Sequence, residues 1–452
     1  MKSINPSTNE LIRDYPEHTS SEVKEIINDV QTEWLAWRET SFEHRSKLFK
    51  QTARLLRERK EDYARLMTAE MGKIIRESMA EIEKCANACD FYSDHAAEFL
   101  KDEIIPTDAS LSLVTYQPLG IIFAVMPWNF PFWQVFRFAV PSIMAGNAAV
   151  LKHASNVPGC ALAIEEIFRD AGFPENLFRT LMLPSREVAS VIGNHDIAAI
   201  TLTGSEAAGS EVAAAAGKLI KKTVLELGGS DAFVILKDAD IEKAVKTAIT
   251  ARMINQGQSC IAAKRFIVVE NRKKDFEIRV KIALDALRIG DPLDPQTDVG
   301  PLARFDILQD LDKQVQKSVA AGARILLGGK PGDQPGCYYL PTILTDVKPG
   351  MSVYHEETFG PVLSIISVEN EEEAIKVAND SDFGLGGSVW TEDLERGEFV
   401  ARKIQAGAVF VNGLVKSDPR LPFGGIKKSG YGRELGEAGI REFVNTKTIW
   451  IG

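Results

Sequence analysis

Short runs of apolar residues, bounded by glycine and proline, alternate along much of the chain with stretches whose apolar positions recur at helical spacing. The first series of runs predicts strands at 119–126, 148–151, 177–183, 197–202 and 223–227. Between two of these strands, residues 159–171 have apolar positions three and four apart and are predicted to form a helix. Strands that are hydrophobic at nearly every position are covered on both faces, so this β–α repeat predicts a doubly wound parallel sheet.

The same alternation occurs again in the second half of the chain. It predicts strands at 232–236, 266–269, 362–367 and 408–412, and helices at 241–256 and 371–379. We therefore predict an α/β protein with two doubly wound, Rossmann-like domains and a cleft between them.

The N-terminal region is predicted to be helical. Thr19 and Glu22 form a capping-box pattern in front of an apolar stripe that continues to Trp37. A second amphipathic helix is predicted over residues 46–71.

Composition and charge narrow the class of protein. The 452 residues carry a net charge of −10, and no apolar stretch approaches the roughly 18 residues that span a bilayer. The acidic balance argues against a general affinity for nucleic acid or anionic membranes. No charged segment followed by an apolar one stands at the start of the sequence, so we expect no secretory signal. These features predict a cytoplasmic protein without nucleic-acid or membrane partners.

Cysteine usage agrees with a reducing compartment. The chain has five cysteines, an odd number without the spacing of a disulfide framework, so most are expected to be free thiols. Cys85 and Cys89 stand four positions apart near His95, but a fourth ligand for a structural zinc ion is missing. We therefore predict no metal site.

Three short motifs place reactive side chains beside glycine or proline. Cys260 ends the sequence Asn-Gln-Gly-Gln-Ser-Cys, Glu226 precedes Leu-Gly-Gly at the end of an apolar strand, and Asn129 lies between aromatic residues and prolines. A thiol can act as a nucleophile, a buried carboxylate as a general base, and a rigidly held amide as an oxyanion donor. Taken singly, each motif fits a structural role as well: an inert thiol, a solvated carboxylate and a turn.

A fourth motif follows the strand predicted at 197–202. Residues 203–209, Thr-Gly-Ser-Glu-Ala-Ala-Gly, lead into a helix of small residues, where a pyrophosphate could meet exposed N–H groups. Close helix packing would also explain the small residues, and the chain contains neither a G-x-G-x-x-G fingerprint nor a Walker A motif. This motif alone leaves cofactor binding open.

Six motifs occur together in one order along the chain. They are Pro-Trp-Asn-Phe-Pro at 127–131, Thr-Gly-Ser at 203–205, Leu-Glu-Leu-Gly-Gly at 225–229, Gly-Gln-Ser-Cys at 257–260, Glu-Glu-Thr-Phe-Gly-Pro at 356–361 and Pro-Phe-Gly-Gly at 422–425. Their order and spacing resemble the NAD(P)-dependent aldehyde dehydrogenase superfamily over nearly the whole chain, and the compact length looks most like its bacterial succinate-semialdehyde dehydrogenases. The resemblance implies oxidation of an aldehyde to a carboxylic acid, with succinic semialdehyde as the expected substrate and another aliphatic or carboxylated aldehyde as the alternative.

The resemblance implies a catalytic role for each of three residues. Cys260 would be the nucleophile that forms a thiohemiacetal and then a thioester, and Glu226 would be the general base for water. The Asn129 amide and the Cys260 backbone N–H would form the oxyanion hole. Ala262 replaces the second cysteine of some relatives, so a vicinal disulfide is not expected.

The resemblance also implies a dinucleotide site. Lys152 would contact the adenosine ribose, and Ser155 stands where NAD-preferring members often have Glu. A short hydroxyl leaves room for a 2′-phosphate that Lys152 would attract, so NADP is the predicted cofactor and NAD the alternative. The remaining cofactor contacts implied by the resemblance are Trp128 near the phosphates, Gly204 and Ser205 beside the pyrophosphate, and Glu357 and Phe359 at the nicotinamide ribose.

For the substrate, the resemblance implies a cationic contact to a distal carboxylate. Arg137, eight residues after Asn129, coincides with an arginine that binds this carboxylate in succinate-semialdehyde dehydrogenases. A second arginine of some relatives is Ile254 here, so Ser417 and its neighbours Lys416 and Arg420 are candidates for the missing contact. A surface arginine without a role is the alternative for Arg137.

The resemblance divides the chain into three parts. Residues 1–100 and 121–228 would form the cofactor-binding domain, residues 229–428 the catalytic domain, and residues 101–120 with 429–452 a small β oligomerisation element. Protruding strands near 107–120 and 443–451 would need a partner edge, so a homodimer or homotetramer is expected.

Other activities lead to different expectations. A hydrolase using Cys260 and Glu226 would turn over substrate without a nucleotide, but it would leave a cofactor-binding half unexplained, and no G-x-S-x-G elbow is present. A CoA-acylating aldehyde dehydrogenase would transfer the thioester, whereas the retained Glu226 favours hydrolysis. A non-catalytic protein would need a decayed site, and the motifs are intact.

Overall fold

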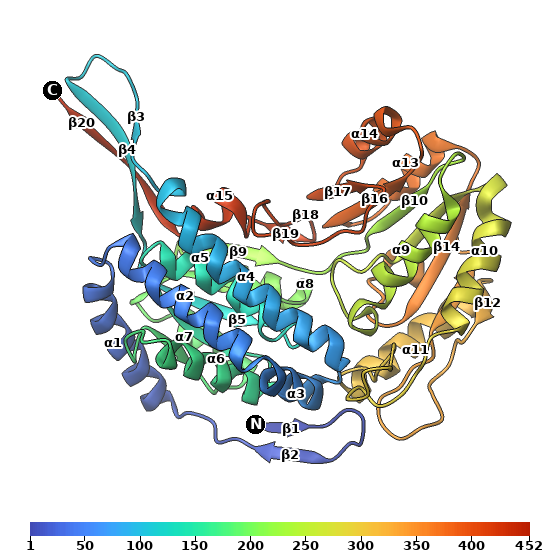
Figure 1. Ribbon diagram of the computed structural model, residues 1–452, viewed down its shortest axis with the longest axis horizontal. Coiled ribbons are helices and arrows are strands. Elements are labelled where there is room, and N and C mark those ends of the chain that lie inside the picture. The colour runs from blue at the N-terminus through green and yellow to red at the C-terminus, as the bar shows by residue number, and fades with distance from the viewer.

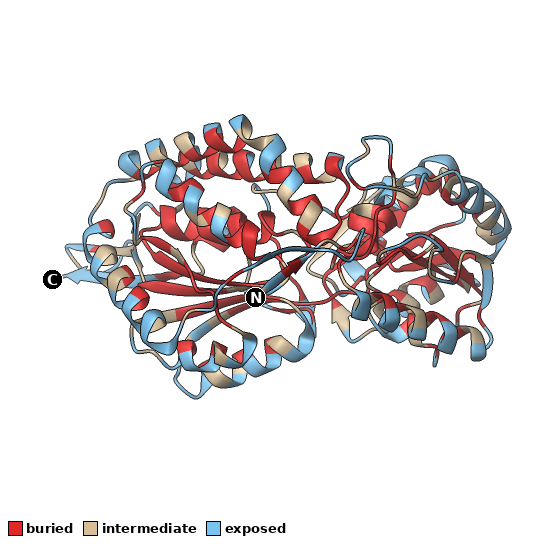
Figure 2. Cartoon of the chain, turned by 90° about the horizontal axis from the view of Figure 1, so that it is seen from below, coloured by how far each residue is buried: buried red, intermediate tan, exposed pale blue.

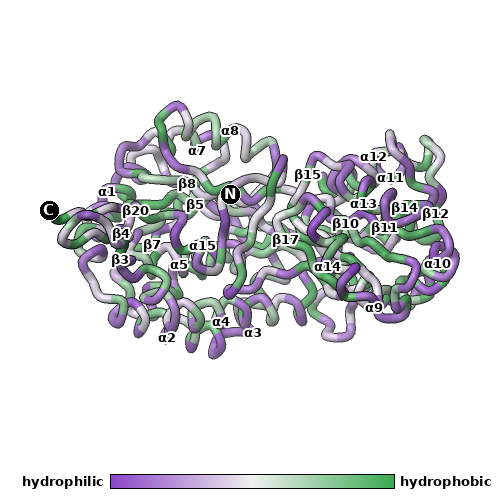
Figure 3. Tube along the Cα trace, turned by 90° about the horizontal axis from the view of Figure 1, so that it is seen from above, coloured by the Kyte–Doolittle hydropathy of each residue, from purple (hydrophilic) through white to green (hydrophobic).

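The computed structural model describes residues 1–452. Two α/β units lie side by side, and a narrow arm that contains the C-terminus projects from the first unit (Figure 1). Buried residues concentrate in the strands and on the inner faces of the helices (Figure 2). The same central strands are the most hydrophobic parts of the trace (Figure 3).

The first unit is built on a six-stranded sheet whose order is β19-β9-β8-β5-β6-β7. Strands β5 to β9 are parallel to one another, and the edge strand β19 pairs antiparallel with β9. The strands are β5 (Ile121–Met126), β6 (Ala148–His153), β7 (Phe178–Thr180), β8 (Ile197–Thr203), β9 (Lys222–Glu226) and β19 (Gly430–Tyr431). The helices between them are α5 (Trp133–Met144), α6 (Pro158–Asp170), α7 (Val188–Ile192) and α8 (Glu206–Gly217). The five predicted apolar strands and the predicted helix at 159–171 are confirmed.

The second unit contains a seven-stranded sheet in the order β12-β13-β14-β11-β10-β16-β17, parallel except for β12. The strands are β10 (Ala232–Ile235), β11 (Arg265–Val269), β12 (Arg324–Leu327), β13 (Thr342–Thr345), β14 (Val362–Val368), β16 (Gly386–Trp390) and β17 (Ala408–Val411). The helices are α9 (Ile241–Met253), α10 (Glu270–Asp285), α11 (Phe305–Ala320), α12 (Ser352–His355), α13 (Glu371–Asn379) and α14 (Leu394–Lys403). The four predicted strands are present.

Both faces of the second sheet are covered, as the hydrophobicity of its strands predicts. Along β10, Phe233 and Ile235 belong to one hydrophobic core cluster, while the alternate residues Ala232 and Val234 belong to another. Successive side chains of a strand point to opposite faces, so the two clusters lie on opposite sides of the sheet.

The N-terminal helices correct one prediction. The capping box that starts α1 (Ser20–Trp37) is present, with Thr19 accepting from the Glu22 N–H and Glu22 accepting from the Thr19 N–H. The single helix predicted over 46–71 is wrong, because the chain forms α2 (Phe42–Glu58) and α3 (Lys60–Met71) instead. Arg59 leaves the helical conformation between them and pairs with Asp170 at 2.6 Å.

The remaining elements belong to the first unit, to the arm and to a separate two-stranded sheet formed by β15 and β18. They are β1 (Lys2–Ile4), β2 (Leu11–Asp14), α4 (Ile75–Phe99), β3 (Glu103–Ile104), β4 (Leu111–Pro118), β15 (Phe383–Gly384), β18 (Ile426–Lys427), α15 (Gly436–Ile440) and β20 (Val444–Ile451). In the arm, β20 pairs antiparallel with β4 over its whole length, which confirms the two predicted terminal strands. No helix has the length and apolar character needed to cross a membrane.

Candidate active site

A cavity of about 280 Å³ lies between the two α/β units. Both units contribute to its walls, which is where the sequence predicted a cleft. Seven of the predicted site residues line it: Trp128, Asn129, Gly204, Ser205, Cys260, Glu357 and Phe359. The other five, Glu226, Lys152, Ser155, Arg137 and Ser417, lie outside this lining.

An unusual backbone leads into Cys260. Helix α9 ends at Met253, three residues earlier than predicted, because Asn255 and Gln256 adopt left-handed conformations with φ of 49° and 54°. Gly257 continues the turn with φ of +76°. Such conformations are costly for residues other than glycine and persist only where the surroundings hold them.

Buried polar side chains hold this turn in place. The Asn255 N–H donates to Glu77 at 2.8 Å, and the Arg252 guanidinium donates to the carbonyls of Thr358 (2.9 Å) and Gly360. A Cβ on Gly257 would lie 2.1 Å from the Gly360 carbonyl oxygen, so no other residue fits there without moving the backbone. The position of the thiol is therefore set by the backbone before it.

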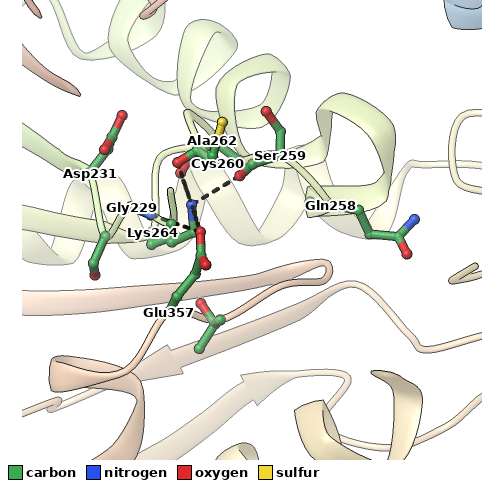
Figure 4. Close-up of polar contacts among 12 residues, drawn as sticks. Gly229, Asp231, Gln258, Ser259, Cys260, Ala262, Lys264 and Glu357 are labelled. Atoms are coloured by element: carbon green, nitrogen blue, oxygen red, sulfur yellow. Dashed lines mark hydrogen bonds and ion pairs between the residues drawn. The ribbon is translucent and has the colours of Figure 1, made fainter. Parts of the chain in front are cut away.

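Lys264 fixes the turn on the other side of the thiol. Its buried ammonium donates to the carbonyl oxygens of Ser259 (3.0 Å), Cys260 (2.8 Å) and Ala262 (3.1 Å), as Figure 4 shows. The same ammonium lies 3.5 Å from the Glu357 carboxylate. With these carbonyls turned toward Lys264, the Cys260 backbone is held on both sides.

The Cys260 thiol is half-buried, and its surroundings favour the neutral form. Burial raises its pKa to about 12, while the nearby cations Arg137 and Lys264 act in the opposite direction. Such a thiol reacts only when a base accepts its proton or when another positive charge arrives. The other four cysteines are fully or nearly buried free thiols.

Glu226 lies at the end of β9 in a buried position. Neither carboxylate oxygen has a hydrogen-bond partner, and burial, followed by the nearby Glu434, raises its pKa well above the usual range. Arg137 acts against this shift. A buried, unpartnered carboxyl group with a raised pKa has the properties of a general base that operates near neutral pH.

Arg137, on α5, is buried, so the alternative of a surface arginine is wrong. Its side chain is buried and forms an ion pair with Glu434, and it donates to the Thr203 hydroxyl at 3.3 Å. Its guanidinium also lies 4.6 Å from the centre of the Phe423 ring. The arginine is thus already paired, but close enough to Cys260 and Glu226 to influence both.

The Asn129 side chain is buried beside the thiol. Its amide nitrogen donates to the Gln258 carbonyl at 3.1 Å, and its own backbone carbonyl accepts from the Asn255 amide at 2.7 Å. Two asparagines therefore tie the strand end after β5 to the turn before Cys260. The Asn129 amide has a second N–H available for an oxygen in the cavity.

Another part of the cavity lining combines glycine backbone with the side chains of Glu357, Trp128 and Phe359. Glu357 accepts from the Gly229 N–H at 2.9 Å, and a Cβ on Gly228 would lie 2.4 Å from a Glu357 oxygen. The rings of Trp128 and Phe359 meet edge to face, with centroids 5.7 Å apart. The absence of a side chain on Gly228 therefore allows the Glu357 carboxylate to pack against the backbone there.

Ser205 caps the helix that follows β8. Its hydroxyl accepts from the Ala208 N–H at 3.3 Å at the start of α8, so the free N–H groups of the first turn face the cavity edge with Gly204. A helix N-terminus of this kind attracts phosphate groups.

Lys152 and Ser155 lie at the end of β6. The Lys152 ammonium is buried, donates to the Ser185 hydroxyl at 3.2 Å and has no carboxylate within ion-pair distance, while Ser155 is exposed. Burial lowers the pKa of Lys152. Between them, the buried His153 ring contacts the Pro131 carbonyl oxygen at 2.9 Å and so links this strand end to the loop of Asn129.

Two further residues near the site had no signal in the sequence. Glu434 pairs with Arg137, and Lys84 donates to the Ser417 hydroxyl at 2.7 Å. Ser417 itself is buried, whereas its neighbour Lys416 is exposed and Arg420 pairs with Asp418 at 2.6 Å. These residues come from segments far apart in the sequence, so no spacing pattern connects them.

The chain is similar to known proteins over its whole length. Residues 1–449 match the family model described as "Aldehyde dehydrogenase family". The chain is 54% identical over 449 residues to a "Probable succinate-semialdehyde dehydrogenase [NADP(+)]" from Synechocystis sp., covering 99% of both proteins. It is 48% identical over 454 residues to "Succinate-semialdehyde dehydrogenase [NADP(+)] 1" from Mycobacterium tuberculosis, again with 99% of both covered.

A solved structure also supports membership in this family. Succinic semialdehyde dehydrogenase from Streptococcus pyogenes, in complex with NADP+, superposes with a TM-score of 0.98 at 39% identity, over 100% of this chain and 99% of that one. The fold, the extent of the match and the identity agree, and this chain belongs to the aldehyde dehydrogenase family.

Proposed function

We propose that this protein oxidises succinic semialdehyde to succinate with NADP+. The observation that carries the proposal is the half-buried Cys260 thiol between a glycine-walled cavity and a group of buried cationic side chains. Relatives that cover 99% of the chain and bear the name succinate-semialdehyde dehydrogenase [NADP(+)] support the substrate and the cofactor.

The residues around the cavity fit a dinucleotide phosphate. Lys152 is a buried cation without a carboxylate partner, and the exposed Ser155 leaves space beside it for a 2′-phosphate. Gly204 and Ser205 offer a helix N-terminus to the pyrophosphate, and Glu357 is placed to accept from ribose hydroxyls. Trp128 and Phe359 would flank the remaining part of the cofactor, which supplies the hydride acceptor when bound.

In this proposal Cys260 carries the covalent chemistry. Its Sγ forms a bond to the aldehyde carbon as the thiol releases its proton to solvent water, and the carbonyl oxygen becomes an alkoxide. The free N–H of the Asn129 amide and the Cys260 backbone N–H would donate to that oxygen. Loss of hydride from the carbon leaves a thioester on Cys260, and water then cleaves the C–S bond to give the acid and the free thiol.

Glu226 would be the base in the hydrolytic half. Its unpartnered oxygens can accept a proton from water, and the raised pKa lets the same carboxyl group return that proton to the departing thiolate. Arg137 and Glu434 adjust this pKa in opposite directions.

Arg137 and Ser417 are proposed to bind the distal carboxylate of the substrate. Arg137 carries five N–H donors, of which Glu434 and Thr203 use only part, so a second carboxylate can share the guanidinium. Without the Glu434 pair, an arginine buried to this extent would be a costly uncompensated charge.

A substrate and cofactor panel tests the proposal. Cofactor reduction is followed by absorbance with succinic semialdehyde, butanal and hexanal, each with NADP+ and with NAD+. We expect the highest kcat/KM for succinic semialdehyde with NADP+ and no turnover without a nucleotide. Preference for an uncharged aldehyde would refute the substrate, preference for NAD+ would refute the cofactor, and nucleotide-independent turnover would indicate a hydrolase.

The assembly and the compartment complete the proposal. The arm exposes large apolar side chains, among them Ile104, Trp450 and Ile451, along strands with an unpaired edge. Such an edge is normally covered, so we propose a homodimer or homotetramer formed through residues of the arm. The five free thiols fit the cytoplasm.

A further inference from the structure

Lys84 extends from α4 toward α5 and the loop that contains Ser417. Its ammonium donates to the Ser417 hydroxyl at 2.7 Å and lies 4.2 Å from the centre of the Trp133 ring. The Trp133 indole N–H donates to the same hydroxyl oxygen at 3.1 Å. Three segments that are distant in the sequence thus meet at one serine.

The hydroxyl of Ser417 can still donate one hydrogen bond, but it can accept no more. A hydroxyl oxygen has two acceptor positions, and here Lys84 and Trp133 occupy them. The remaining O–H can only donate, and it donates no hydrogen bond to another residue of the chain. The buried serine is therefore a donor that awaits an acceptor.

Lys84 is likewise a cation without an anion. No carboxylate lies within 4.0 Å of its ammonium, whereas the buried Lys73 on the same side of the unit pairs directly with Glu81. Among the charged groups that act on Lys84, the cation Arg137 has the largest effect on its pKa and lowers it together with burial. Two positive charges placed together in a desolvated region are costly unless they share a ligand of opposite charge.

The other cations near Ser417 are not available for this purpose. Lys416 is exposed, and Arg420 forms two contacts with the Asp418 carboxylate, at 2.6 and 2.8 Å. Position 254, which could have supplied a second arginine, is an isoleucine. Lys84 is the remaining cation that faces Ser417.

We propose that Lys84 is a specificity-determining residue that, with Ser417 and Arg137, binds the distal carboxylate of a short semialdehyde. The inference rests on the proposed function and adds a residue to it. Lys84 supplies the second positive charge, Ser417 donates its O–H, and Trp133 holds both in position. A carboxylate accepts all of these donors at once, while the methyl end of an uncharged aldehyde accepts none.

The pH dependence of substrate binding adds a second readout. Burial and then Arg137 lower the pKa of Lys84 to about 8, and Cys85, Glu81 and Asp418 act weakly in the opposite direction. The ammonium form, which binds the carboxylate, therefore decreases as the pH passes through about 8. KM for the semialdehyde should rise above that pH, and this rise should be absent when residue 84 cannot titrate.

The test compares Lys84→Met with Lys84→Arg and Lys84→Gln. The readout is the ratio of kcat/KM for succinic semialdehyde to that for butanal, supported by inhibition by succinate and by a thermal melt for each variant. Because a charge-assisted hydrogen bond is lost, Lys84→Met and Lys84→Gln should lower the ratio about ten- to hundredfold and weaken succinate inhibition similarly. Lys84→Arg should retain most of the ratio, without the rise of KM above pH 8.

The control is Lys50→Met, the same change on the neighbouring helix α2, where the ammonium already pairs with Asp94 at 2.8 Å. This control should keep the wild-type ratio. An unchanged ratio in folded Lys84→Met and Lys84→Gln would overturn the role of Lys84 while leaving the proposed function intact. A wild-type enzyme that does not prefer the semialdehyde would instead refute the proposed function itself.

Discussion

The two sides of Cys260 are built from different materials. On the proposed cofactor side, the walls include backbone N–H groups, glycines, a helix N-terminus and the rings of Trp128 and Phe359. Arg304 lines the cavity there, and the buried Lys152 lies outside its lining. On the proposed substrate side, the walls are long charged and aromatic side chains of α4 and α5, among them Arg137, Lys84 and Trp133.

This difference predicts that the two sides tolerate different kinds of amino-acid substitution. A wall of backbone and glycine has no room for added atoms, as the 2.4 Å approach of a Gly228 Cβ to Glu357 shows, but it loses little when a distant charge changes. A wall of buried charges accepts changes of shape better than changes of charge, because each charge is balanced by another. Substitutions on the two sides should therefore separate in stability as well as in specificity.

The largest expected effect lies between the two sides. Cys260→Ala should lower kcat by about 10⁴ or more, because the covalent route is lost. Binding of NADP+ and of succinate, measured by calorimetry, should persist, since neither wall is altered. Cys337→Ala, at a buried thiol outside the cavity, is the control and should keep the wild-type kcat. Comparable activity in Cys260→Ala would rule out the thioester.

On the substrate side, Arg137→Met should affect both stability and specificity. Removal of the guanidinium leaves Glu434 as an uncompensated buried charge, so the free energy of unfolding should fall by about 3–5 kcal/mol. Denaturant titration measures this value, and kinetics should show a loss of preference for the semialdehyde over butanal.

The matched control for this change is Arg59→Met. Its pair with Asp170 is about one-third exposed on each side, so the loss should be about 1 kcal/mol or less. If the free energy of unfolding fell equally in the two variants, the proposed difference between buried and exposed ion pairs would be wrong.

On the cofactor side, Lys152→Met should have a smaller and more selective effect. The loss of one charge-assisted hydrogen bond to a 2′-phosphate should raise KM for NADP+ about tenfold and change KM for NAD+ much less. The unfolding free energy should change little, because Lys152 has no carboxylate partner that would be left uncompensated. Lys218→Met, at an exposed lysine after α8, serves as the control. A parallel rise for both cofactors would contradict the phosphate contact.

The last prediction concerns the pH dependence of the reactivity of the Cys260 thiol in the unmodified enzyme. With the pKa of Cys260 raised to about 12, the thiolate fraction of the free enzyme rises about tenfold per unit from pH 7 to pH 10. The rate of carbamidomethylation of Cys260 by iodoacetamide should follow this slope. Arg137→Met should react more slowly at each pH, because that cation lowers the thiol pKa. A plateau below pH 10 would show that the thiol is already ionised.

The same contrast explains how much of the molecule could be predicted from the sequence. Most of the parallel strands were predictable because they are short apolar runs. The cavity motifs were predictable because a glycine or proline beside a polar residue marks a strand end. Two parallel strands were missed: β13 has only two apolar residues between threonines, and β16 begins with Gly386 and Gly387, so both lack the dense apolar signal. The break at Arg59 was missed because helical spacing continues across it.

The substrate side was only partly predictable for a physical reason. Arg137 and Ser417 were identified by resemblance, but the Glu434 pair and the Lys84 contact depend on tertiary packing between segments more than 280 residues apart. Charged residues on helices are common, and nothing in the local sequence of Lys84 distinguishes it from a solvated lysine. Only the folded chain shows that its ammonium faces a buried serine without an anion.

The most direct test of the central claim uses Glu226→Gln, which retains the shape of the proposed base but cannot accept a proton from water. Mixed rapidly with succinic semialdehyde and NADP+, this variant should reduce about one cofactor per chain in a burst and then stop. Peptide mass spectrometry of the quenched sample should find a succinyl group on Cys260. Steady turnover at the wild-type rate, or a burst without a succinyl group on Cys260, would contradict the account.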